Sequence, residues 1–197
     1  GRLSVLQENG AALHNHGTPI LVNIINGKGM LCTHNNARET FDRAEEISGE
    51  VMRQQYWDKD TTCHGCPLAC GKNVKAKEGM FAGKSVKMPE YETIYAIGSM
   101  LDNADMNSII NGNHLCDLMG LDTISMGVTL SFVAECIERG IISEADFGGA
   151  VNFADGPGMV ELIGKTARKE GIGAKLAKGS QRLAREFGGD AYKYLYA

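Results

Sequence analysis

Three cysteines stand within eight residues of this chain, at Cys63, Cys66 and Cys70. Their spacing, C-x2-C-x3-C, has the gaps of the ligand runs that hold cubane iron–sulfur clusters. A four-iron cluster needs four protein ligands, and this run supplies three of them. The backbone around the run must therefore bring three sulfur atoms toward one point. The remaining cysteines are scattered singly and add no second run: Cys32, Cys116 and Cys136.

Other interpretations of the cysteine run stay open. If 63–70 were helical, positions i, i+3 and i+7 would share one face, although Pro67 favours a bend there. Zinc sites usually pair two CxxC or CxxH knuckles, no second knuckle is present, and the position of His64 strains a Cys3His set. A thioredoxin-like pair would need a βαβ setting that the sequence does not offer. Three buried structural thiols are the plainest alternative, and the crowding favours an iron–sulfur cluster over it.

Helical periodicity dominates the sequence, and alternating strand patterns are scarce. We predict an all-α fold, an irregular helical domain that spans 1–197 as one unit. One short β-hairpin is expected near 72–87, where Glu78-Gly79 offers a turn. The expected helices cover 3–13, 18–27, 89–100, 103–119, 121–139, 159–170 and 173–187, with a short turn capped at Ser143. Between them we expect a turn at 35–40 that leads into an amphipathic segment through about 47, helical or irregular structure at 50–57, and a polar approach to the cysteines at 58–62.

The composition is that of an ordinary globular chain, with 43% hydrophobic residues, 22% charged residues and a formal net charge of −4. No basic stripe or polybasic cluster is present, which argues against nucleic acid and anionic membranes as partners. No apolar run approaches the roughly 20 residues that cross a bilayer, and the start lacks a signal peptide. We therefore expect reduced cysteines and a cytoplasmic location. The first residue is not methionine, so we expect the chain to begin inside a longer polypeptide.

Two carboxylates lie just after Pro89, where Glu90 and Glu92 bracket Tyr91. Carboxylates in the first turn of a helix are usually solvated residues that favour the helix dipole. A carboxylate at this place could instead relay protons during a reaction. The sequence alone leaves both interpretations open.

A second motif reads Asp117-x-x-Gly120-Leu121-Asp122. Its carboxylates could accept hydrogen bonds from the N–H groups of a ligand, and its glycine lets the backbone approach a flat ring. From spacing alone, the more common explanation is a glycine helix end followed by Asp122 as the cap of the next helix. Asp122 could serve both roles.

The order and spacing of these motifs resemble the tungsten- and molybdenum-containing aldehyde:ferredoxin oxidoreductases. The flanks at 17–23 and 170–173 resemble the family too, so the resemblance spans nearly the whole chain. In that family a tungsten or molybdenum ion is held by two pterin-dithiolene cofactors beside a 4Fe-4S cluster. The family's β-rich, pterin-binding N-terminal domain and its later D-x-x-G-L-C motif, which carries the fourth cluster ligand, are absent here. The resemblance thus implies the middle, helical domain of a larger enzyme.

The resemblance also implies roles for individual residues. Three of them, Cys63, Cys66 and Cys70, match cluster ligands. The first pterin motif of the family is matched by Asp117, Gly120, Leu121 and Asp122. Glu92 is the expected catalytic glutamate near the metal, and Glu90 is the second choice.

Some family members use an E-x-x-H motif to hold a metal between dimer subunits. Here Asn111 replaces that glutamate three residues before His114, and a neutral amide is a much weaker ligand. We therefore expect no metal at this place. Cys116 and Cys136 are expected as buried thiols.

The expected activity of the parent enzyme is oxidation of an aldehyde with water to a carboxylate, with electrons passed through the cluster to ferredoxin. The expected partners are ferredoxin, the aldehyde substrate and the remaining domains of the parent chain, and the parent could be a homodimer. We expect the 197-residue chain alone to be inactive and to lack the pterin cofactor. The alternative is an iron–sulfur electron-transfer or scaffold domain of a related low-potential oxidoreductase, such as an aromatic-ring reductase, without aldehyde activity.

Overall fold

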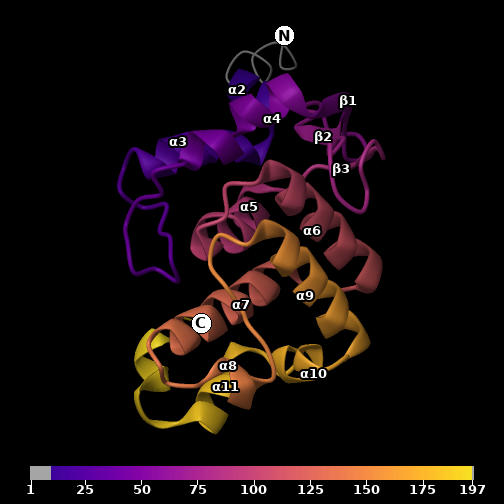
Figure 1. The fold of residues 1–197 in the computed structure, drawn as a ribbon. Coiled ribbons are helices and arrows are strands. Elements are labelled where there is room, and N and C mark those ends of the chain that lie inside the picture. The colour runs from indigo at the N-terminus through magenta and orange to yellow at the C-terminus, as the bar shows by residue number, and fades with distance from the viewer. Residues whose placement is uncertain (1–9, 197) are drawn as a thin grey trace.

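The computed structural model describes residues 10–196, and most of them are helical, as expected. The α-helices are α2 (Ala11–His16), α3 (Leu21–Asn26), α4 (Gly49–Gln55), α5 (Tyr91–Ile97), α6 (Met106–Met119), α7 (Thr123–Glu138), α8 (Glu144–Phe147), α9 (Gly156–Arg168), α10 (Ile172–Leu176) and α11 (Ser180–Phe187). The short 3-10 helices are η1 (Thr18–Ile20), η2 (Ala44–Ile47), η3 (Ser99–Leu101) and η4 (Gly189–Tyr194). In Figure 1, helices α5, α6, α7 and α9 occupy the centre, with α2, α3 and α4 at one end and α8, α10 and α11 at the other.

A small antiparallel sheet lies beside α4, with the strand order β1 (Trp57–Thr61), β2 (Gly71–Val74), β3 (Val86–Lys87). The pairing of β2 with β3 confirms the predicted hairpin near 72–87. Their connection turns at Gly79, whose φ of +92° suits glycine. The sheet has one strand more than the predicted hairpin, and the fold remains mostly helical.

Strand β1 corrects the sequence analysis, which expected a helix end and a polar approach to the cysteines at this place. Ion pairs hold the strand: Arg53 of α4 contacts Asp60 at 2.8 Å, and Lys75 contacts Asp58 at 2.5 Å. The charged residues of this segment indicated a polar loop, because the cations that pair with Asp58 and Asp60 approach them only in the folded chain. The cysteine run is therefore the connection between two paired strands, and 63–70 is not a helix.

Capping residues set the starts of the main helices. Asp105, Asp122 and Asp155 each accept a backbone N–H in the first turn of α6, α7 and α9, respectively. The amphipathic segment that was expected to end at about 47 ends in η2. One predicted helix was too long, since 173–187 breaks into α10 and α11 around Gly179, which has a φ of +80°. The expected helix at 3–13 falls largely outside the described residues, and α2 begins at Ala11.

Helices α5 and α7 pack at unusually close range. A Cβ atom at Gly127 of α7 would collide with the carbonyl oxygen of Ala96 in α5. Near their N-terminal ends, the Thr93 and Thr123 hydroxyl oxygens lie 2.8 Å apart in a hydrogen bond. The two helices thus run side by side in the same direction. Their packing places the segment after Pro89 beside the segment that begins α7.

A buried polar network ties the two ends of the described chain to its centre. Asn35 is fully buried, and its amide nitrogen donates to Glu135 at 2.6 Å and to the carbonyl oxygen of Tyr194 at 2.9 Å. Its amide oxygen accepts a hydrogen bond from Ser131 at 3.0 Å. Glu135 is also buried, and its other carboxylate oxygen, Oε1, forms an ion pair with Arg139 at 2.7 Å. Each buried polar atom of Asn35 therefore has a partner, which is the condition for burying it at low cost.

Within residues 10–196, no single helix is long and apolar enough to cross a membrane. Helices α6 and α7 pass such a test only as a pair, and they are bent against each other by 118°.

We predict that Asn35→Ala lowers the free energy of unfolding by about 2 kcal/mol more than Asn36→Ala, because it leaves the buried Glu135 carboxylate short of a partner. The second variant is a matched control, since both asparagines have a left-handed φ, +50° and +63°. Within residues 10–196, the Asn36 side chain accepts one hydrogen bond, from the Tyr95 hydroxyl. Urea unfolding followed by circular dichroism measures the difference, and equal losses would show that the network does not stabilise the fold.

Candidate functional site

The cysteine loop, residues 62–70, connects β1 to β2. Its first part is a turn in which the Cys66 amide donates to the carbonyl oxygen of Cys63 at 3.0 Å. Thr62 closes the turn by donating its hydroxyl to the Cys66 carbonyl at 2.8 Å, and Gly65 takes a left-handed φ of +67°. The Cys63 side chain is exposed, Cys66 and Cys70 are half-buried, and all three are free thiols. The loop thus lies at the protein surface, with Cys63 the most exposed of its three cysteines.

Two side chains from outside the run hold the backbone of the loop. His14 of α2 lies with its Nδ1 atom 2.7 Å from the carbonyl oxygen of Leu68. Lys72, which is buried, donates its ammonium group to the carbonyl oxygens of Ala69 at 3.0 Å and Gly71 at 3.1 Å. The ammonium group lies behind the loop, 3.5 Å from the Asp60 carboxylate, which offsets part of its positive charge. A positive charge there would favour an anionic iron–sulfur cluster, whose potential depends on nearby charge.

The three sulfur atoms do not converge in this structure. Across residues 10–196, no three His, Cys, Asp or Glu side chains come together as a metal-binding group. The donor chemistry nevertheless fits a cluster, because the set consists of soft thiolate ligands that no disulfide occupies. The ligand roles of Cys63, Cys66 and Cys70 stay a prediction.

The D-x-x-G-L-D motif forms the corner between α6 and α7. Asp117 is exposed in the last turn of α6, and Gly120 ends that helix with a φ of +68°. The carboxylate of Asp122 accepts the Ser125 amide at 2.7 Å, and hydrogen bonds from Ser125 hold the pKa of Asp122 below its usual value. The glycine helix end and the aspartate cap are thus both confirmed. Leu121 is half-buried between them.

The surface around this corner suits a flat, polar-edged ring. Apart from Gly120 itself, its chain neighbours and the backbone of its own helix, no atom of residues 10–196 lies within 4 Å of the position that a Cβ of Gly120 would occupy, so the backbone there is open to a ligand. Exposed apolar side chains surround the corner, namely Leu118, Met119 and Ile124, which are 57%, 44% and 44% exposed. Carboxylate oxygens beside apolar surface fit the N–H groups and the faces of a pterin. The pterin role of the motif stays a prediction.

The two candidate catalytic carboxylates have different surroundings. Glu90 stands at the N-cap of α5, where its Oε2 atom accepts the Thr18 hydroxyl at 2.6 Å and its Oε1 atom lies 3.8 Å from the Lys87 ammonium. Glu92, in the first turn of α5, is exposed. Its carboxylate makes no hydrogen bond or ion pair with any residue in 10–196. Of the two carboxylates, Glu92 is therefore the one that other side chains of the described residues do not hold in place.

Short contacts link the three motifs in space. The hydrogen bond between Thr93 and Thr123 joins the neighbour of Glu92 to the neighbour of Asp122. On the other side, a Cβ at Gly17 would lie 3.0 Å from the carbonyl oxygen of Cys70. The structure thus places the cysteine loop, the carboxylates and the D-x-x-G-L-D corner along one continuous set of contacts.

The sequence analysis missed three residues of this arrangement: His14, Thr18 and Lys72. The sequence analysis placed Thr18 at the start of a helix, and a lone histidine such as His14 gives no motif that would assign it a contact. The hydrogen bond to Leu68 does satisfy His14, but it also fixes the cysteine loop. No spacing rule could find these contacts, since Thr18 and Glu90 are 72 positions apart in the sequence.

Asn111 of α6, which stands three residues before His114, is held by hydrogen bonds. Its side-chain oxygen accepts the Phe81 amide at 2.7 Å, and its side-chain nitrogen donates to the carbonyl oxygens of Glu78 at 2.9 Å and Asn107 at 2.7 Å. The amide thus clamps the β2–β3 connection onto α6. Nearby, burial first and the Lys84 ammonium second lower the pKa of His114.

The two isolated thiols of the helical core are buried, as predicted. Burial raises the pKa of Cys116 and of Cys136 to about 12. Both thiols are therefore inert, small apolar groups in the core.

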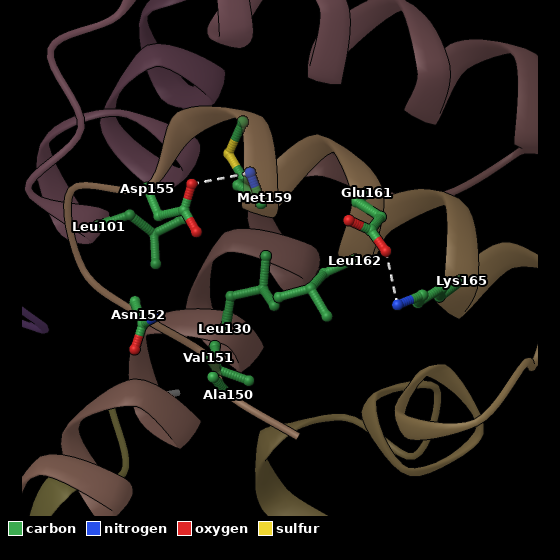
Figure 2. Close-up of a pocket in the computed structure, with 11 residues that line it drawn as sticks. Leu101, Leu130, Ala150, Val151, Asn152, Asp155, Met159, Glu161, Leu162 and Lys165 are labelled. Carbon is green, nitrogen blue, oxygen red and sulfur yellow. Dashed lines mark hydrogen bonds and ion pairs between the residues drawn. The ribbon is translucent and has the colours of Figure 1, made fainter. Parts of the chain in front are cut away.

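A separate pocket of about 160 Å³ lies between α9 and the segment that precedes it (Figure 2). Asp155, the cap of α9, lies at one side of it, and the ion pair of Glu161 with Lys165, 2.6 Å long, lies at the other. Leu101 and Leu130 contribute apolar lining. None of the predicted site residues lines this pocket, so it is not the candidate site.

The chain matches the family model "Aldehyde ferredoxin oxidoreductase, domains 2 & 3" over residues 3–196. The tungsten-containing aldehyde ferredoxin oxidoreductase of Pyrococcus furiosus is 41% identical over 182 residues, which cover 91% of this chain and 29% of that protein. The enzyme of the same name from Pyrococcus abyssi is 40% identical over 188 residues, or 93% of this chain and 30% of that protein. The WOR-like subunit of an aliphatic sulfonate oxidoreductase from Pyrococcus furiosus is 33% identical over 150 residues, covering 76% of this chain and 24% of the subunit.

Among solved structures, the active-site complex BamBC of benzoyl coenzyme A reductase, in complex with 1,5-dienoyl-CoA, has the same fold. The TM-score is 0.64 at 22% sequence identity, and the match covers 83% of this chain and 24% of that chain. The chain spans less than a third of the length of the relatives that it matches. The family model covers residues 3–196, and two relatives are 40–41% identical over about nine-tenths of this chain. The chain therefore belongs to the aldehyde ferredoxin oxidoreductase family.

Proposed function

We propose that this chain is one part of a tungsten–pterin enzyme that oxidises an aldehyde with water to a carboxylate. The observation that carries the proposal is the contact path from Cys70 through Gly17 and Thr18 to Glu90, and from Thr93 to Thr123 at the D-x-x-G-L-D corner. The names of the 40–41% identical relatives support the metal and the substrate class.

The reaction that we propose converts RCHO and water to RCOOH with the release of two protons and two electrons. The bound tungsten pterin and 4Fe-4S cluster would supply the two-electron oxidation and the transfer of single electrons to ferredoxin. Asp117 and Asp122 would accept hydrogen bonds from pterin N–H groups, and Gly120 would let the ring lie against the backbone. Glu92 would take up a proton released as water oxygen adds to the aldehyde carbon.

Cys63, Cys66 and Cys70 would hold the cluster, with the Lys72 ammonium as a nearby positive charge. The fourth ligand, the second pterin motif and most of the substrate pocket would come from other parts of the full-length protein. We place the whole protein in the cytoplasm, where thiols stay reduced. Residues 1–197 would then be a single helical domain that holds one side of the cofactors.

The alternative function is iron–sulfur electron transfer without aldehyde chemistry. The fold that the chain shares with the benzoyl coenzyme A reductase complex does not favour it, because a 22% identical structure supports the fold alone. Analysis of iron, sulfide and tungsten in the anaerobically purified full-length protein separates the possibilities. Zinc alone would overturn the cluster assignment, and a cluster without tungsten or aldehyde oxidation would favour electron transfer.

For the cluster, we predict that Cys70→Ser in the full-length protein lowers bound iron and acid-labile sulfide by at least roughly tenfold, because a ligand thiolate is lost. Cys63→Ser and Cys66→Ser should do the same. Cys32→Ser is the matched control, since Cys32 is a free, half-buried thiol outside the run. If all four variants retain the same iron content, the cysteine run is not the ligand set.

For the proton relay, we predict that Glu92→Gln lowers kcat for aldehyde-dependent dye reduction by about 10²–10⁴-fold, the usual contribution of a general acid or base. Bound iron and tungsten should stay at the wild-type level. Glu161→Gln is the control, because Glu161 is an exposed helix carboxylate far from the site in sequence. A larger loss for Glu90→Gln than for Glu92→Gln would assign the relay to Glu90 instead.

A further inference from the structure

We propose that Thr18 is a positioning residue, which fixes the Glu90 carboxylate and the first turn of α5 beside the cysteine loop. The inference deepens the proposed function, because it concerns the same carboxylates. In this proposal, Glu90 helps to hold the site in place, and Glu92 transfers the proton.

The first support is the pair of hydrogen bonds that the Thr18 hydroxyl makes. Its oxygen accepts the backbone N–H of Tyr91 at 2.9 Å, so it serves as the cap of α5. Its single proton is donated to Oε2 of Glu90 at 2.6 Å. Glu90 occupies the N-cap position but makes no cap hydrogen bond with its own side chain. A residue from η1 thus supplies the cap that the sequence around α5 lacks.

The second support is the different freedom of the two carboxylates. Because the only proton of the Thr18 hydroxyl points to Oε2, that oxygen of Glu90 is held as an acceptor. The other oxygen, Oε1, lies 3.8 Å from the Lys87 ammonium. Both oxygens of Glu90 are therefore engaged. The exposed Glu92 carboxylate, two residues further on, has no such partners within 10–196.

The third support is the position of Thr18 in a short segment that also contacts the cysteine loop. Gly17 has a φ of +68°, and a Cβ there would collide with the Met88 methyl group and lie 3.0 Å from the Cys70 carbonyl oxygen. Three residues earlier, His14 holds the carbonyl oxygen of Leu68. The segment 14–18 therefore contacts the cysteine loop through two of its residues and α5 through a third.

The opposite face of η1 is held just as firmly. A Cβ on Gly49, the first residue of α4, would lie 2.8 Å from the carbonyl carbon of Pro19 and 2.7 Å from the Ile20 nitrogen. Pro19 is buried, and its ring fixes the backbone next to Thr18. The contact with α4 and the proline ring therefore fix the backbone that carries Thr18. The distance between the cysteine loop and the carboxylates follows from the backbone of η1.

The test uses Thr18→Val, which removes the hydroxyl but keeps the shape, and Thr18→Ser, which keeps the hydroxyl. Thr166→Val is the matched control, since Thr166 is a buried threonine of α9 whose hydroxyl donates to the Leu162 carbonyl at 2.7 Å. All variants are made in the full-length protein. The first measurement is hydrogen–deuterium exchange at the Tyr91 amide.

We expect Thr18→Val to speed exchange at Tyr91 about tenfold, because the amide loses its acceptor. Thr18→Ser and Thr166→Val should exchange there as the wild type does. Unchanged exchange in Thr18→Val, or a failure of Thr18→Ser to restore protection, would overturn the proposal. A purely structural role in folding would instead speed exchange throughout the chain, including α9, and would also overturn it.

The second measurement is a double-variant cycle with Glu90→Gln in the holoenzyme. We expect Thr18→Val to lower kcat about tenfold with KM within about twofold, and the double variant to be no slower than the slower single variant. Independent, multiplying losses would contradict positioning through Glu90. If the wild-type protein oxidises no aldehyde, the proposed function fails, while the exchange measurement still decides the role of Thr18.

Discussion

The close packing of α5 against α7 is the constraint on which the candidate site depends. Gly127 allows the α7 backbone to touch the Ala96 carbonyl, and the Thr93–Thr123 hydrogen bond fixes the relative height of the two helices. A bulkier residue at 127 would separate the helices and with them the carboxylates and the D-x-x-G-L-D corner. The site therefore gains its geometry from a contact that includes none of its own chemistry-bearing side chains.

The buried Asn35 network has a complementary role at the other side of the molecule. It joins residues near the start, centre and end of the described chain through one amide group and the Glu135 carboxylate. Apolar packing alone does not fix how such distant segments align, whereas hydrogen bonds inside the protein demand one arrangement. The network therefore fixes how the segments around α5 and α7 are arranged, in addition to stabilising them.

Local rules predicted the parts of the fold that local interactions decide. The caps Asp105 and Asp122 and the helix end at Gly120 follow from residue type and spacing, and the structure has them. Strand β1 was missed because the cations that pair with its aspartates, Arg53 of α4 and Lys75 just after β2, come close to them only in the folded chain. The motifs of the site could be named from the sequence, but not the contacts between them, because Thr18 meets Glu90 only through the tertiary fold.

The cysteine loop joins two strands of a small peripheral sheet, and the contacts that hold it reach backbone carbonyl groups rather than sulfur atoms. The helical core does not need the thiols for its own packing. The loop backbone is therefore held in place by His14 and Lys72 whatever its thiols bind, so a change at a cysteine side chain need not disturb the helices that carry the carboxylates.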